Sequence, residues 1–161
     1  MDLEEGIGLA APQVGVGLNL IVLGVPMPEP EDGLPTMFTS PGEASLLPRM
    51  PIALVNPRLS NLSAETDERE EGCLSIPDVR GYVVRPIQVD VDALTLDGAP
   101  LHMRCGGLLG RCIQHEVDHL NGKLFIEYLD EEDRAAVDAK LRRLKKRTQS
   151  ELKKQRNHLV A

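Results

Sequence analysis

The strongest constraint in this chain of 161 residues is the run RCIQHEVDHLNG at residues 111–122. On an α-helix, His115 and His119 stand one turn apart on the same face, with Glu116 beside them. The apolar positions of the run indicate that Glu116 and His119 point inward, where a carboxylate without a partner would be costly. The run therefore predicts a buried helix that binds a divalent metal through two histidines.

Two histidines leave a first-row divalent metal short of ligands, so a catalytic site needs a third donor and one open position. Cys73, in EGCLSIP at residues 71–77, is the best candidate, because its flanks describe a tight turn that exposes a thiol. Taken alone, a free cysteine is also consistent with a small buried hydrophobic residue. Cys105 and Cys112 lack such flanks, and we interpret both as structural.

A Cys-His-His set with an open position suits hydrolysis, because the cation lowers the pKa of a bound water towards ~7 and polarises a carbonyl. Glu116 can take the proton from that water and pass it to a leaving amine. The glycine-rich run GIGLAAPQVG at residues 6–15 offers backbone amides and the Gln13 side chain to the negative charge of a tetrahedral intermediate. This run does not fit a dinucleotide-binding fingerprint, because Ala11 stands where the third glycine is required.

Composition places limits on the class of protein. The chain fits one domain, residues 1–161, and its core must consist of aliphatic side chains, because only 2% of its residues are aromatic. Three cysteines at irregular spacing do not make a disulfide framework and favour a reducing compartment. No apolar run approaches the ~20 residues that span a bilayer, and no secretory signal is apparent. We therefore expect a soluble, cytoplasmic protein.

Alternating apolar residues and turn signals predict a series of strands. Residues 18–25 and 52–57 are rich in β-branched and aliphatic residues, and an Asn-Pro pair ends the second run. Residues 87–92 alternate between apolar and polar, a change of phase at Ala93 indicates a bulge, and Asp97-Gly98 predicts a hairpin turn. Strands that follow one another closely and are joined by such turns pair antiparallel, so we expect mostly antiparallel sheets.

Residues 26–51 interrupt this pattern. They contain seven of the 12 prolines, which break both helices and strand ladders, so we expect a long insertion loop without regular structure. Long loops are often lids over functional sites. We favour a tolerated surface insertion, because loop length adds little closure entropy.

The C-terminal region predicts an amphipathic helix over residues 130–158 with a strongly basic second half. Residues 1–139 carry 9 Lys/Arg against 24 Asp/Glu, a net charge of −15, whereas residues 140–161 carry 9 against 1, a net charge of +8. This asymmetry is typical of a tail that meets a polyanion, but a solvated helix packed on an acidic body explains it equally well.

No internal repeat is visible, and the elements combine into one fold class. We expect an α+β domain in which mostly antiparallel sheets surround a buried metal-binding helix, followed by the C-terminal amphipathic helix.

Three runs, GIGLAAPQVG, EGCLSIP and QHEVDHLNG, resemble in this order the signature motifs of peptide deformylases, over residues 6 to about 128. That family removes the formyl group from N-formylmethionine at the start of nascent peptides and releases formate. The resemblance implies that Cys73, His115 and His119 hold one divalent metal, most often Fe²⁺ in the cell, with Zn²⁺, Ni²⁺ or Co²⁺ as substitutes. It also implies a role in protein biosynthesis.

The resemblance further implies roles for individual residues. Glu116 would be the acid and base of the reaction, and the Gln13 side chain and the Leu74 backbone amide would stabilise the oxyanion. Ile7 and Gly8 would bind the peptide backbone. The pocket for the methionine side chain would be lined by Glu71, Leu108, Arg111, Cys112 and the ligand His115.

The resemblance also extends to charged residues and to a partner. Arg80 and Arg85 match positions near the family's substrate entrance, and a pairing of Arg85 with Asp118 is expected. The family's basic C-terminal helix is associated with docking near the ribosomal exit tunnel, and residues 140–156 look similar in charge and placement. This likeness favours a contact with ribosomal RNA, which should depend strongly on salt.

Two departures from the family pattern are visible. Members normally carry some forty residues ahead of the first motif, whereas only five precede it here, and the insertion at residues 26–51 is longer than in the common bacterial form. Two alternatives remain beside a deformylase. One is a zinc metallopeptidase that cuts internal peptide bonds, and the other is a non-catalytic, ribosome-associated module in which the metal only stabilises the fold.

Overall fold

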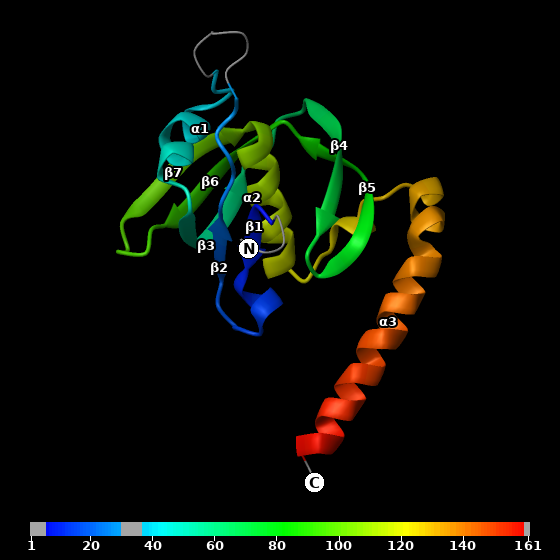
Figure 1. Cartoon of the computed structure of the whole chain (residues 1–161). Helices are drawn as coiled ribbons and strands as arrows, with labels where there is room; N and C mark the ends of the chain where they lie inside the picture. The colour runs from blue at the N-terminus through cyan, green and yellow to red at the C-terminus, as the bar shows by residue number, and fades with distance from the viewer. Residues whose placement is uncertain (1–5, 30–36, 160–161) are drawn as a thin grey trace. The chain divides into compact units, whose positions relative to one another are not determined.

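The computed structural model describes residues 6–29 and 37–159, and Figure 1 shows its course. It is a mixed α+β structure with antiparallel sheets, as the sequence predicts. The chain divides into two compact units, Met1–Glu68 with Val84–Leu124 and Arg69–Val83 with Phe125–Ala161. This division does not test whether residues 1–161 form the single domain expected from the sequence, so that expectation stays a prediction.

The first unit is built on a five-stranded sheet whose order is β1-β2-β3-β6-β7. Each neighbouring pair of strands in it is antiparallel. Its strands are β1 (Gly8–Ala10), β2 (Leu20–Leu23), β3 (Ile52–Ser60), β6 (Gln88–Leu94) and β7 (Pro100–Gly106). The strands β4 (Thr66–Cys73) and β5 (Ile76–Pro86) form a separate two-stranded sheet. The predicted strands are therefore present, whereas the sequence pattern does not predict β1, β4 and β5.

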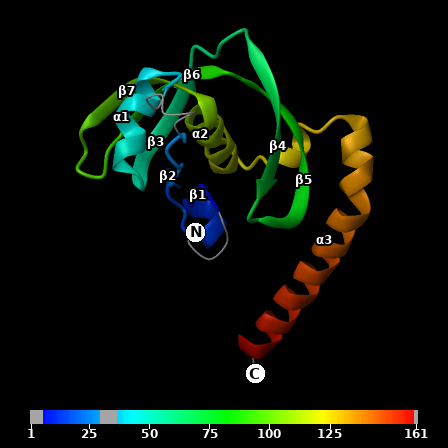
Figure 2. The same ribbon diagram turned by 45° about the horizontal axis from the view of Figure 1, so that its top comes forward.

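Helix α2 (Gly107–Leu120) packs on the five-stranded sheet and contacts all five of its strands (Figure 2). It buries Leu109 and Ile113 completely, against core residues such as Ile21 and Val89. Gly122, with φ of 72°, follows the C-terminus of the helix, where glycine tolerates a left-handed conformation. The predicted helix and its inward face are confirmed.

Two predictions for the sheet need correction. Strand β3 does not end at Pro57, because it continues to Ser60 after a register shift between Val55 and Arg58. Asn56 lies inside that shift with φ of 51°, and asparagine tolerates this region better than most residues. The bulge in this sheet is therefore at the Asn-Pro pair.

The bulge predicted at Ala93 is absent from β6. Pairing with β7 runs without a shift through Ala93 opposite Leu101 and Leu94 opposite Pro100. The prediction failed because Ala93 itself is buried and continues the inward alternation, while Leu94 is exposed. The turn at Asp97-Gly98 is confirmed, since the Thr95 amide donates to the Ala99 carbonyl at 2.9 Å and Gly98 has φ of 83°.

The insertion is not a loop throughout, and residues 30–36 of it lie outside the described residues. It contains helix α1 (Pro41–Leu46) and the 3₁₀ turn η2 (Leu47–Arg49). Proline breaks the interior of a helix, but Pro41 occupies the first helical turn, where its missing N–H is not required. Figures 1 and 2 both show α1 beside β7, and Leu46 and Leu47 join the hydrophobic core.

The second unit contains the 3₁₀ turn η3 (Phe125–Glu127) and the 29-residue helix α3 (Glu131–Leu159), which confirms the predicted C-terminal helix. The Asp130 carboxylate caps α3 by accepting from the Asp133 amide at 2.8 Å. Asp133 in turn accepts from the Tyr82 amide of β5 at 3.2 Å, and the Lys140 ammonium donates to the Asp78 carbonyl. None of the described helices is both long and apolar enough to cross a membrane.

Truncation of the α2 face that meets the sheet should destabilise the fold. Ile113 is fully buried, so Ile113→Ala is expected to lower the free energy of unfolding by about 2–5 kcal/mol. Leu96 is 75% exposed, so Leu96→Ala is the matched control, with an expected change within about 0.5 kcal/mol. Urea unfolding monitored by circular dichroism measures both changes. Equal effects of the two substitutions would contradict this packing.

Candidate active site

Helix α2 presents the predicted histidines and glutamate together. The rings of His115 and His119 lie with their centroids 4.8 Å apart and their planes at 88°. Glu116 is 4% exposed and His119 is 8% exposed, while His115 is half-buried. A helix that is buried on this side therefore carries two imidazoles and a carboxylate within five consecutive residues.

Among the described residues, one group of three or more His, Cys, Asp or Glu side chains could hold a metal ion. It consists of Cys73, His115 and His119, each of which offers one ligand atom, and these atoms all lie within 4.8 Å of one another. The Ser75 amide donates to the Cys73 sulfur at 3.4 Å. One thiolate and two imidazoles suit Fe²⁺, Zn²⁺ and related ions, so the donor set fits a divalent metal.

The glycine-rich run brings its backbone against Glu116. Gly8 lies in β1, and a Cβ atom built on it would stand 2.3 Å from Oε1 of Glu116 and 2.8 Å from Sγ of Cys112. A side chain there would displace the Glu116 carboxylate or the Cys112 thiol, which gives a physical reason for glycine at this position. The Cys112 thiol also donates to the Ile7 carbonyl at 3.5 Å. Ile7 and Gly8 are thus adjacent to the helix that carries the predicted acid and base.

Gln13 lies in the 3₁₀ turn η1 (Ala11–Val14), directly after β1. Its Oε1 atom accepts a hydrogen bond from the Ala10 amide at 2.7 Å. This bond orients the side-chain amide, whose other end is an N–H donor group. Gly15, with φ of 76°, ends the turn. The role of Gln13 towards an oxyanion, like that of the Leu74 amide, stays a prediction.

Arg111 has a definite partner that the sequence did not indicate. Its guanidinium is 7% exposed and donates to Oδ1 of Asp67 at 2.6 Å and to the Asp67 carbonyl at 2.9 Å. A buried arginine needs such charge-assisted bonds, and these two connect α2 to the start of β4. The other predicted pocket residues range from Glu71 and Cys112, which are buried, to Leu108, which is 39% exposed. Their role around a methionine side chain stays a prediction.

The predicted pairing of Arg85 with Asp118 is confirmed. The Arg85 guanidinium donates to Oδ2 of Asp118 at 2.8 Å, and the arginine is 5% exposed. Asp118 precedes the ligand candidate His119, so this ion pair restrains the last turn of α2. Arg80 differs, because its contact with Glu70 at 3.7 Å is on the surface and adds little stability.

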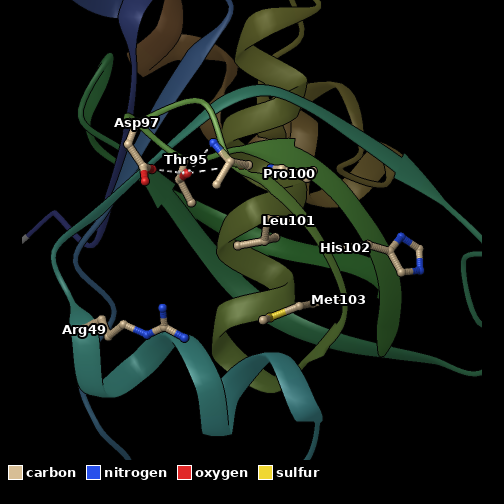
Figure 3. A pocket seen from close by; sticks show the side chains of 8 residues that line it. Arg49, Thr95, Asp97, Pro100, Leu101, His102 and Met103 are labelled. Carbon is tan, nitrogen blue, oxygen red and sulfur yellow. Dashed lines mark hydrogen bonds between the residues drawn. The ribbon is translucent and has the colours of Figure 1, made fainter.

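A pocket of about 470 Å³ lies beside η2 and the β6–β7 hairpin (Figure 3). Its lining residues are Arg49, Thr95, Asp97, Ala99, Pro100, Leu101, His102 and Met103. The Thr95 hydroxyl bonds within the turn, to Asp97 and to the Ala99 carbonyl. The hydrogen bond between His102 Nδ1 and Asp92 Oδ1, 2.7 Å long, raises the pKa of His102. None of the predicted site residues lines this pocket.

The family model, the curated relatives and the solved structures compared with this chain all represent peptide deformylases. The family model of polypeptide deformylase matches residues 1–135. A peptide deformylase of Acinetobacter baumannii (strain SDF) is 37% identical over 151 residues, which are 94% of this chain and 75% of that protein. One of Opitutus terrae (strain DSM 11246 / JCM 15787 / PB90-1) is 42% identical over 158 residues, with coverages of 95% and 79%.

Solved structures agree with this assignment. A crystal structure of peptide deformylase from Ehrlichia chaffeensis matches with a TM-score of 0.73 and 36% identity, over 94% of this chain and 79% of that one. A peptide deformylase structure from Plasmodium falciparum matches with a TM-score of 0.75 and 29% identity, with coverages of 92% and 77%. The chain therefore belongs to the polypeptide deformylase family, metal-dependent hydrolases that remove the formyl group from nascent peptides.

Proposed function

We propose that this chain hydrolyses the formyl amide of N-formylmethionyl peptides with Cys73, His115 and His119 as metal ligands and Glu116 as the acid and base. The observation that carries the assignment is the burial of Glu116 between two histidines, with the β1 backbone at Gly8 lying directly against its carboxylate.

When bound, a divalent cation supplies Lewis acidity, which polarises the formyl carbonyl and makes water a better nucleophile at neutral pH. Glu116 takes a proton from the attacking water and later delivers it to the amine. A carbon–oxygen bond forms, the carbon–nitrogen bond breaks, and the products are formate and a free N-terminal amine. The Gln13 amide nitrogen and the Leu74 backbone N–H donate to the oxyanion in between.

Substrate contacts are assigned to the elements around α2. Ile7 and Gly8 bind the peptide backbone, which the position of β1 at the edge of its sheet, beside Glu116, supports. The methionine pocket is assigned to Glu71, Leu108, Arg111 and Cys112. Because Asp67 binds the Arg111 guanidinium, we expect the aliphatic part of Arg111, rather than its charge, to contact the substrate.

Replacing the proposed acid and base should stop turnover without removing the metal. Glu116→Gln keeps the shape of the side chain but cannot accept a proton, so formate release from a formyl-Met peptide should fall by roughly 10²- to 10⁴-fold. Metal content, measured by plasma emission spectrometry, should stay near one ion per chain. Glu65→Gln, at an exposed site, is the control and should retain activity.

Other outcomes of this experiment identify other functions. Full activity of Glu116→Gln would refute the assigned role. Cleavage of internal peptide bonds without formate release would indicate a zinc metallopeptidase. A wild-type protein that binds metal but releases no formate would indicate a module in which the metal only stabilises the fold.

We assign the bound ion as Fe²⁺. Iron with a thiolate ligand in a site open to solvent is prone to oxidation, so activity should decline in air. Protein purified without oxygen should contain iron and lose most formate release after exposure to air, and Zn²⁺ should restore little of it. Metal analysis alongside the formate assay measures this. Equal activity of the Fe²⁺ and Zn²⁺ forms in air would contradict the assignment.

We assign the basic half of α3 to the ribosome, and hence the protein to the cytoplasm. Arg143, Lys145 and Lys146 are exposed on this helix, and phosphate contacts explain why so many cations gather there. Replacing these three with glutamate should abolish co-sedimentation with ribosomes, and raising salt from 50 to 200 mM should weaken wild-type binding by at least about tenfold. Replacing Glu131 and Glu132 with glutamine is the control. Sedimentation unchanged by charge reversal would refute this partner.

A further inference from the structure

Helix α2 begins without a cap of its own. The residue before its first turn is Gly106, which has no side chain to accept a hydrogen bond, and the first turn contains no acidic residue. The first N–H groups of a helix lack partners within the helix, and this end carries a partial positive charge. Another segment of the chain, or water, must therefore satisfy these N–H groups.

The inserted segment around α1 lies at this end. The Ser40 hydroxyl accepts a hydrogen bond from the Gly106 amide at 2.9 Å and, at 3.3 Å, another from the Glu43 amide of its own helix. The Glu43 carboxylate lies directly against Gly107, because a Cβ atom there would be 2.1 Å from its Oε1 atom. Gly107 has φ of 55°, which also favours glycine.

Glu43 is held firmly in this position. It is 3% exposed, and its Oε2 atom accepts from the Thr39 amide at 2.7 Å, from the Thr39 hydroxyl and from the Ser40 hydroxyl at 3.4 Å. Burial, and next the negative charge of Glu43, raise the pKa of the Cys105 thiol to about 12. The buried side chain of Glu43 therefore lies at the start of α2, where the helix dipole favours a negative charge.

We infer that Glu43 is a positioning residue for the reaction, which acts by anchoring the first turn of α2 from the inserted segment. That turn carries Leu108 and leads into Arg111, the two pocket residues nearest the anchor, whereas His115, Glu116 and His119 lie two or more turns further along. Loss of the anchor should therefore disturb substrate binding more than the chemical step. The kinetic part of this inference rests on the proposed function.

The test compares Glu43→Gln with the wild-type metal-loaded protein. Glutamine keeps the size of the side chain and loses its charge, so amide hydrogen exchange of residues 108–111 should become about 2- to 30-fold faster. On a formyl-Met peptide, KM should rise several-fold while kcat stays within about twofold. Glu29→Gln, an exposed position of the same insertion, is the matched control and should change neither quantity.

Unchanged exchange in the first turn of α2, or a fall in kcat with KM unchanged, would overturn the inference. Exchange that accelerates equally in β6 and α2 would also overturn it, because that result indicates global destabilisation. If Glu43→Gln does not fold, Thr39→Val removes one donor to the same carboxylate and should give the same pattern in weaker form. A wild-type protein without formate release would defeat the proposed function but leave the exchange result intact.

Discussion

The burial of α2 against the five-stranded sheet is the interaction on which the rest of this structure depends. Leu109 and Ile113 are fully excluded from water, and at ~25 cal/mol per Å² of apolar surface such residues each contribute on the order of 2 kcal/mol. The same rotation of the helix that buries them turns Glu116 inward and presents His115 and His119. Packing and chemistry are therefore set by one helical orientation.

Charged side chains from other segments hold this helix along its length. Glu43 lies at its first turn, Asp67 binds Arg111 at the start of the second turn, and Arg85 binds Asp118 near the end. Each of these contacts is buried or partly buried, where the loss of one partner would leave an uncompensated charge. These three contacts keep the turn that carries His115 and His119 in place. They also explain how α2 can begin at Gly106 without a capping side chain of its own.

Local patterns predicted much of the fold. The helix of residues 111–122, the hairpin at Asp97-Gly98 and the C-terminal helix follow from periodicity and turn chemistry, which act over a few residues. Patterns failed where tertiary contacts intervened. The insertion forms α1 because Pro41 sits where a helix starts and Leu46 finds a place in the core. The Asn-Pro pair bends β3 rather than ending it, because β6 pairs with the strand on both sides of the shift.

Residue types and their spacing along the chain already specify the side chains available for chemistry: two imidazoles and a carboxylate at helical spacing, a cysteine before a turn, and an amide in a glycine-rich run. These are properties of residue type and of short-range geometry. Folding in three dimensions was needed to place Gly8 against Glu116, Glu43 against Gly107, and Asp67 on Arg111. Those contacts join residues more than forty positions apart, and the packing of the sheet, which no local pattern encodes, brings them together.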